Sequence, residues 1–275
     1  IAVDMGGYRI AEAIANSTSE VYFSGILIAS MVGCTISFTL PLALGMVKEK
    51  YIDILCKGIL CGIGTLPVGL FLGGLLLKIP ISHIFIDILP IAIISILIII
   101  GLNKFPSIMI KSFKVLAKII FIIGIIGLGL QGVKAITGIS LVNNLLTLEE
   151  AITIVGKIAI FLSGANVMLE VIKKLFKKQI EKLENVMNIN SYSVTALIGS
   201  LASAVIVFTN FDKLDNRGKV ICSAFSVGGA YVFGGQLAYV VTEAKEVVFI
   251  YIIVKLISGL LAIVLALKMI KGVKN

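Results

Sequence analysis

Long, uninterrupted apolar runs fill this chain and constrain its fold more than any other feature. Ile, Leu, Val, Gly and Ala follow one another without the polar alternation that the strands of a membrane barrel require. A helix that spans a bilayer needs about 20 mostly apolar residues. The sequence therefore predicts an all-α, polytopic membrane helix bundle with a shorter first helix at 1–17. The expected spans are 21–47, 52–77, 84–102, 113–134, 148–176, 192–209, 218–242 and 246–270.

The composition also excludes a soluble domain. Of the 275 residues, 59% are hydrophobic and 14% are charged, whereas soluble domains are about 45–50% apolar and about 25% charged. The net charge of +9 comes from basic residues at the ends of apolar runs, so we expect a lipid bilayer and no nucleic acid as partner. The four cysteines lie inside apolar runs and His83 is the single histidine, so no metal or cofactor is expected. We treat 1–275 as a single transmembrane domain.

Two distant parts of the chain, about 1–77 and 188–270, look like copies of one another. Duplicated helices that are interrupted by glycine and small polar residues are how many secondary transporters build a site at mid-membrane. The copies run parallel if every segment crosses once; an inverted relation requires one segment to re-enter, and the sequence leaves both open. The duplication favours a transporter. The aligned pairs are Tyr8 with Tyr192, Gly33 with Gly228, and Phe38 with Phe233.

The first candidate site opens the first copy. Asp4 lies in an apolar segment, where a carboxylate costs roughly 3 kcal/mol or more at the helix centre and is by default a functional candidate. Gly6 and Gly7 free the backbone to expose polar groups, and the ring of Tyr8 offers a face to a small cation. The alternative is that Asp4 caps a helix at the interface and that the glycines and Tyr8 only pack.

Hydroxyl groups precede a proline in the next helix of the first copy. Pro41 removes a backbone hydrogen bond and frees carbonyls one turn earlier. Hydroxyls and freed carbonyls could hold an ammonium group or Na⁺, although the hydroxyls can instead bond back to their own helix. The hydroxyl residues are Thr35, Ser37 and Thr39.

The second copy has a glycine-rich counterpart of this segment. Gln236 is polar in a span that could otherwise be entirely apolar, so it is expected to line the site. The neighbouring glycines either shape the site or allow close helix packing; they are Gly228, Gly229 and Gly235. Lys57, Lys157 and Lys255 also lie in apolar runs; we expect each to extend toward an interface, and the alternative, a buried lysine, would be unusual.

Several ordered motifs resemble the ethanolamine utilisation transporter family, EutH. The resemblance covers essentially the whole chain. It implies a multi-pass permease in the bacterial cytoplasmic membrane that takes up ethanolamine, with a possible coupling ion (proton or Na⁺) and a possible homo-oligomer. Family members carry further N-terminal helices, so the chain is expected to be an N-terminally truncated fragment. The motifs are DMGG at 4–7, YFSGIL at 22–27, TISFTLPLALG at 35–45, GIGTLPVG at 62–69, NIN at 188–190, DNRGKVI at 215–221 and KLISG at 255–259.

Some positions depart from the family pattern. The family has paired asparagines and a proline at 203–206, an Asp-His pair at 235–236 and an asparagine at Ser191. The alternatives are therefore transport of another small polar or cationic solute, or a structural or sensor role without transport. An enzyme is not expected, because the spans contain no acid pair, metal set or nucleophile with a base. The candidates that carry over from the resemblance are Asp4, Gly6, Gly7, Pro41, Asn188 and Asn190.

Overall fold

The computed structural model describes residues 8–139, 149, 152, 171 and 174–270. Within these ranges the chain is helical and contains no strand, which confirms the all-α fold. Asp4, Gly6 and Gly7, and most of the span expected at 148–176, lie outside the described residues. Five helical segments in the described part are long and apolar enough to cross a membrane. They are Thr18–Met46, Glu49–Leu76, Ile81–Lys104, Pro106–Thr137 and Lys245–Met269.

The short helix α1 (Tyr8–Ile14) precedes the first long segment, which consists of four consecutive parts. Ser17 caps its start by accepting a hydrogen bond from the backbone N–H of Glu20. The central parts have π-helical hydrogen bonding, a wider arrangement that is frequent at functional sites. The parts are α2 (Thr18–Tyr22), η2 (Phe23–Gly33), η3 (Thr35–Thr39) and α3 (Leu40–Met46), which carries Pro41 at its start.

Helix α4 (Ile52–Leu76) follows the 3-10 turn η4 (Glu49–Tyr51) and is the central helix of the body. It packs against α5, α11 and α13. Its glycines allow close approach: a Cβ at Gly62 would lie 2.5 Å from the backbone oxygen of Ala224. Helices without a hydrophobic driving force between them depend on such small residues at their contacts.

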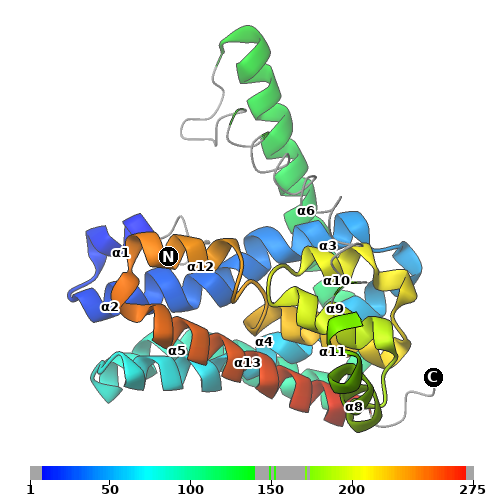
Figure 1. Ribbon diagram of the computed structural model, residues 1–275. Helices are drawn as coiled ribbons and strands as arrows, with labels where there is room; N and C mark the ends of the chain where they lie inside the picture. Colours follow the sequence, from blue (N-terminus) through cyan, green and yellow to red (C-terminus); the bar gives the residue numbers. More distant parts are fainter. Residues whose placement is uncertain (1–7, 140–148, 150–151, 153–170, 172–173, 271–275) are drawn as a thin grey trace.

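Helices α5 (Ile81–Lys104) and α6 (Pro106–Thr137) continue from α4. The beginning of α6 contacts α3, α4 and α5, and its remainder projects from the body (Figure 1). Large apolar side chains are exposed along both helices, for example Ile86 at 68% and Ile123 at 63%. Such surfaces are expected for helices that face lipid.

The next segment does not cross the membrane, although 192–209 was predicted as a span. After α8 (Lys177–Met187), the chain forms α9 (Ser191–Ser200), turns, forms α10 (Val205–Thr209) and η5 (Phe211–Lys213), and returns to its starting level. The two ends are joined: the Asn190 side-chain amide donates to the Lys213 carbonyl at 2.9 Å, and the Asn190 N–H donates to the Asp215 carboxylate at 3.0 Å. Residues 190–215 are therefore a re-entrant hairpin.

The following crossing is interrupted, as the glycine-rich sequence predicts. It consists of α11 (Asn216–Gly228) and α12 (Gly235–Glu243), separated by residues 229–234. Tyr231 has a positive φ of 64° there, a conformation that breaks a right-handed helix. The turn η6 (Lys245–Val247) leads into the last helix, α13 (Val248–Met269).

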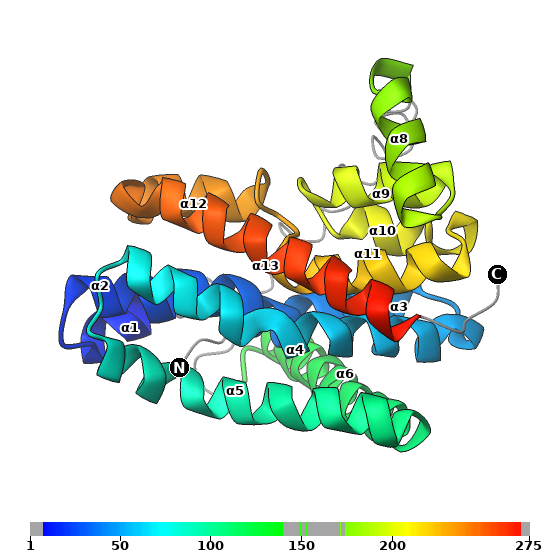
Figure 2. The same ribbon diagram turned by 90° about the horizontal axis from the view of Figure 1, so that it is seen from below.

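The two halves run in opposite directions (Figures 1 and 2). Helices α4 and α13 are antiparallel, because Gly73 lies beside Val254, whereas Gly64 lies beside Leu265. Segment Thr18–Met46 and the pair α11–α12 are also antiparallel, since Thr35 contacts Val227 and Ser30 contacts Gln236. With the re-entrant hairpin, these directions match an inverted relation between the halves rather than a parallel one. The duplication itself remains a prediction.

Candidate functional site

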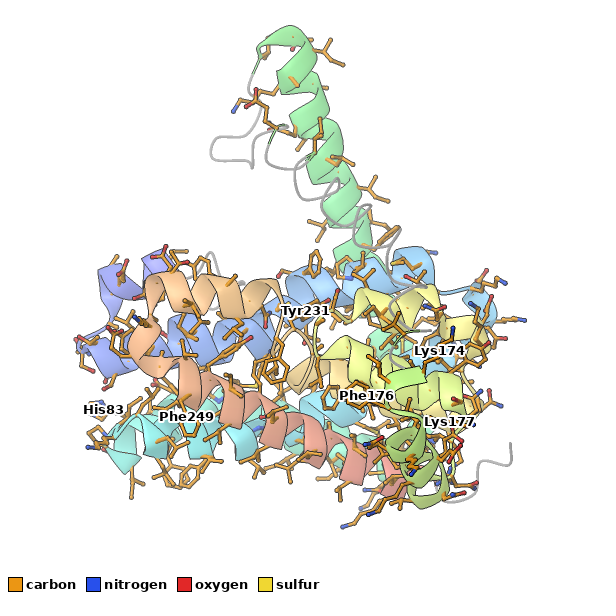
Figure 3. All side chains as sticks on the ribbon, viewed as in Figure 1. His83, Lys174, Phe176, Lys177, Tyr231 and Phe249 are labelled. Carbon is orange, nitrogen blue, oxygen red and sulfur yellow. The ribbon has the colours of Figure 1, made fainter. Side chains whose placement is uncertain are left out.

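The tip of the re-entrant hairpin meets the interruption between α11 and α12. The Tyr231 N–H donates to the Ser200 carbonyl at 3.0 Å, and the Phe233 N–H donates to the Leu201 carbonyl at 2.8 Å. Backbone donors that the broken helix would have used are thus satisfied by the hairpin, which keeps irregular backbone within protein. Figure 3 shows Tyr231 near the middle of the body's length. Breaks near mid-membrane are where many transporters build their sites.

A buried lysine on α13 reaches the same region. Lys255 is 1% exposed. Its Nζ donates to the carbonyl oxygen of Ser30 in η2 at 3.1 Å and to Oε1 of Gln236, near the start of α12, at 2.9 Å. The Gln236 Nε2 donates to the same Ser30 carbonyl at 3.2 Å. One ammonium group therefore links the π-helical segment of the first half to the broken helix of the second.

Tyr251 completes this cluster from the same helix as Lys255. Its hydroxyl lies 3.1 Å from the Tyr231 carbonyl and 3.3 Å from Gln236 Oε1, and its single hydrogen can be donated to either. Lys255 Nζ lies 5.7 Å from the centre of the Tyr251 ring, within the range of a cation–π contact. We call Ser30, Tyr231, Gln236, Tyr251 and Lys255 the polar junction.

The polar junction has the chemistry of an ammonium site. It offers two carbonyl oxygens, an amide that both donates and accepts, a hydroxyl and an aromatic face. These groups belong to two irregular segments and one long helix, so a shift of either segment changes the site. Inside a membrane an unpaired polar group costs several kcal/mol. Any group bound at the polar junction must therefore pair with its donors and acceptors.

The first-copy hydroxyls mostly bond within their own helix. Thr35 Oγ1 donates to the Met31 carbonyl at 2.6 Å and Ser37 Oγ donates to the Gly33 carbonyl at 2.8 Å. Thr39 lies 3.8 Å from Cys34 Sγ, and Pro41 is partly buried in α3. These contacts match the alternative of bonding back to the helix. Thr35 also lines a cavity of about 460 Å³ between α3, α4, α5 and α6, whose other lining residues are almost all apolar.

Tyr8 lies at the other end of α12 from Gln236. Its hydroxyl donates to the Glu243 carbonyl at 3.2 Å, and its ring meets Tyr239 edge-on with the centroids 6.3 Å apart. Glu243 follows Gln236 by seven positions in the helix, which corresponds to about 10 Å along the axis. Tyr8 thus packs α1 against the end of α12 that lies away from Gln236.

The three glycines of the second copy have different surroundings. A Cβ at Gly228 would meet Ser258 at 2.8 Å, and one at Gly229 would meet the Phe225 ring at 2.4 Å. Both therefore allow close packing, as the alternative stated. Gly235 is exposed, and no described atom lies within 4 Å of a Cβ added there.

The two asparagines carried over from the resemblance lie at the open end of the hairpin. Asn188 adopts a left-handed conformation with φ 52° and ends α8. Asn190 caps α9, because its Oδ1 accepts the Ser193 N–H at 2.8 Å. Neither contacts the polar junction within the described residues; both shape the hairpin whose tip reaches it.

The sequence prediction missed Lys255, Tyr251 and Ser30. Lys255 was expected to extend toward an interface, but it is buried, and Lys57 is only partly buried. A lysine in the middle of an apolar run was the available signal. The carbonyl of Ser30 could not be recognised, because any residue supplies a carbonyl and only the fold selects this one.

The comparisons with known proteins identify the family of this chain. The chain matches the family described as Ethanolamine utilisation protein, EutH, over residues 1–269. It is 34% identical over 269 residues to a probable ethanolamine permease EutH of Listeria monocytogenes, with 98% of this chain and 72% of that protein covered. It is 29% identical to a probable ethanolamine permease EutH of Salmonella typhimurium, with coverage of 98% and 72%.

An uncharacterized protein of Bacillus subtilis, YxeR, is 35% identical, with 95% of this chain and 71% of that protein covered. No solved structure matches. The family match over nearly the whole chain and the apolar helices together establish a multi-pass bacterial membrane protein. This chain belongs to the EutH family of ethanolamine utilisation proteins.

Proposed function

We propose that this protein is a permease that carries ethanolamine into the cell and that the polar junction is its substrate site. The names of the Listeria and Salmonella relatives, both probable ethanolamine permeases, support the substrate. The observation that carries the proposed site is the Lys255 ammonium, whose two hydrogen bonds to the junction's acceptors support a site for a primary ammonium group. Two interrupted segments meet there, in the arrangement from which transporters build sites.

The chemistry of ethanolamine suits these groups. Its ammonium has three donors and no acceptor, and its hydroxyl both donates and accepts. Gln236 can accept from the ammonium through Oε1 and donate to the hydroxyl through Nε2, while Tyr251 supplies a hydroxyl and a ring face. A cation at this depth also benefits from a counter-charge. We propose Asp4 for that role, with Gly6 and Gly7 as part of the same site, and we expect Asp4→Asn to weaken uptake strongly.

The direct test is uptake of labelled ethanolamine into vesicles that contain the full-length protein. Uptake should saturate, exceed that of protein-free vesicles and return ethanolamine chemically unchanged, since we propose transport without catalysis. Imposed proton and Na⁺ gradients identify a coupling ion, and light scattering of the purified protein gives its oligomeric state. Uptake equal to that of protein-free vesicles would reject the function.

The departures from the family pattern call for a competitor series. Residues 203–206 include the end of the hairpin tip, and Gln236 belongs to the junction, so both departures lie in the region of the proposed site. Unlabelled ethanolamine should compete better than methylamine, which lacks the hydroxyl, and better than choline, whose quaternary nitrogen has no N–H donor. Stronger competition by another small amine would reassign the substrate and retain the transporter.

A further inference from the structure

Lys255 presents to the polar junction the same chemical group as the proposed substrate. Its side chain is a primary ammonium on a short alkyl chain, and Nζ lies 2.9 Å from Gln236 Oε1 and 3.1 Å from the Ser30 carbonyl. Both acceptors are uncharged, and both belong to irregular segments. A substrate ammonium that used these oxygens would have to replace Nζ, because two ammonium groups at one pair of acceptors would repel each other.

We propose that Lys255 is a tethered competitor that occupies the ammonium subsite of the resting protein. A primary amine then binds when Nζ leaves the Ser30 carbonyl and Gln236 Oε1. This proposal rests on the proposed function. It adds that the ammonium subsite is blocked by Lys255 until a primary ammonium ion on a short chain takes its place. In the occupied state Nζ bridges the Ser30 carbonyl of η2 and Oε1 of Gln236 in α12, and exchange for substrate transfers this bridge from the tethered ammonium to a free one.

The position of Lys255 makes such an exchange feasible. It lies on the regular helix α13, so its side chain can move without unfolding backbone. Tyr251, one turn earlier, keeps its hydroxyl near Gln236 Oε1 when Nζ moves away, so the amide retains a donor. The tether also keeps the effective concentration of the competing amine high and lowers the apparent affinity for free substrate.

The size of the side chain allows a direct test. Truncation of Lys255 to alanine removes the atoms from Cγ to Nζ, which are as many heavy atoms as ethanolamine contains. The variant Lys255→Ala should therefore leave a space of the size of a small primary amine. It should also leave the Ser30 carbonyl and Gln236 Oε1 without the hydrogen bonds that Nζ donates to them. We expect the purified full-length variant to bind ethanolamine on the order of tenfold more tightly than wild type, because the site is open in every molecule.

The experiment measures thermal stability and binding in a series of amines. Ethanolamine and n-propylamine should raise the melting temperature of Lys255→Ala, whereas tetramethylammonium, which has no N–H donor, should not. Lys57→Ala, at the partly buried lysine of α4, is the matched control and should bind like wild type. Lys255→Met fills the space with an apolar chain, so it should show no gain in amine affinity.

If Lys255→Ala folds only when it is purified with a primary amine, the rescue itself supports the proposal. Equal ethanolamine affinity in Lys255→Ala and wild type would overturn it, and so would a folded Lys255→Ala that tetramethylammonium stabilises as well as ethanolamine. Failure to recover the variant with or without amines, while Lys255→Met folds, would also overturn it. If the wild-type protein takes up ethanolamine but Lys255→Ala gains no affinity for it, the tethered competitor is rejected and the transport function stands. If primary amines rescue the folding of Lys255→Ala but the wild-type protein takes up no ethanolamine, the transport function is rejected and the amine subsite stands.

Discussion

Gln236 and Ser30 are hydrogen-bonded at 3.2 Å although they lie 206 positions apart in the sequence. Ser30 belongs to the π-helical part of the first long segment, and Gln236 is the second residue of the helix that follows the break in the second half. The contact therefore joins the two irregular segments directly. Because each segment supplies only part of the acceptor set, the polar junction exists only when the halves are packed together.

Replacing Gln236 with leucine should weaken substrate binding more than it lowers the amount of protein. The change removes Oε1, which accepts from Lys255, and Nε2, which donates to Ser30. A hydrogen bond to a charged group contributes about 1.5–3 kcal/mol, so KM for ethanolamine should rise roughly tenfold to a hundredfold. Uptake kinetics in vesicles, normalised to the folded protein measured by size-exclusion chromatography, would test this.

The control for this variant is Thr242→Val on the same helix. Thr242 is exposed and its hydroxyl bonds back to the Ala238 carbonyl at 2.9 Å, so its loss should leave KM unchanged. Wild-type KM in Gln236→Leu would remove the amide from the substrate site. Equal increases in both variants would indicate a general effect on α12.

Gly62 should not tolerate even a methyl group. A Cβ there would lie 2.5 Å from the Ala224 backbone oxygen and 2.6 Å from a Val227 methyl, so α4 and α11 would have to separate. Overpacking of this kind costs typically 1–3 kcal/mol. Gly62→Ala should therefore lower the melting temperature of the detergent-solubilised protein, and the shift of α11 should also reduce uptake.

Gly129→Ala on α6 is the matched substitution. Gly129 is exposed, and no described atom lies within 4 Å of a Cβ added there, so the more helix-prone alanine should leave stability unchanged or slightly higher. Equal melting temperatures of Gly62→Ala and Gly129→Ala would show that α4 and α11 do not approach each other as closely as described.

The ion pair between Lys48 and Asp212 should show in the titration of the carboxylate. The hydrogen bond from Lys48 lowers the pKa of Asp212, and the carboxylate raises the pKa of Lys48. The depressed pKa of Asp212 means that its contribution to stability is present above its unfolded value, about 3.9. That contribution is lost as the pH falls through the lower folded value.

Lys48→Met should raise the pKa of Asp212 toward the ordinary value, as followed by NMR of labelled aspartate. Both groups are exposed, so thermal stability at neutral pH should change little. An unchanged titration of Asp212 in the variant would show that the pair does not form in solution.

The long helices were predictable because a continuous apolar run specifies a span without reference to the rest of the fold. The runs at 52–77, 84–102 and 246–270 correspond closely to α4, α5 and α13. The run at 192–209 was also apolar enough to be predicted as a span, yet it forms the hairpin. A hairpin buried between helices and a crossing helix have the same hydropathy, and the contacts that decide between them join Asn190 to residues more than twenty positions away.

The polar junction was predictable only in part. Gln236 stood out because an amide in an apolar span needs partners. The role of Lys255 was not visible, because a lysine in such a run usually extends to an interface. Whether it does so depends on which face of α13 packs against the first half, and sequence periodicity does not specify that face. For Ser37 the sequence left two alternatives, and the hydrogen bond of its hydroxyl to the Gly33 carbonyl matches bonding within its own helix; a role in substrate binding stays a prediction.

Asp215 should be the most sensitive residue at the open end of the hairpin. Its carboxylate accepts from Ser193 Oγ at 2.6 Å, from the Asn190 N–H at 3.0 Å and from the Gly218 N–H at 3.3 Å, so it both caps α11 and holds α9. Loss of an N-cap costs about 1 kcal/mol, and each charged hydrogen bond adds about 1.5–3 kcal/mol. Asp215→Ala should therefore destabilise the protein clearly, and Asp215→Asn, which can still cap, should do so less.

Measurements of uptake distinguish a role of the hairpin in positioning the polar junction from a role in thermal stability alone. The hairpin tip supplies the Ser200 and Leu201 carbonyls that hold the break around Tyr231, so loosening its base should displace the polar junction. We expect Asp215→Ala to reduce ethanolamine uptake per folded molecule even well below its melting temperature, with Asp215→Asn intermediate. The contrary result, full uptake by Asp215→Ala at a reduced melting temperature, would mean that the hairpin supports the fold without positioning the site.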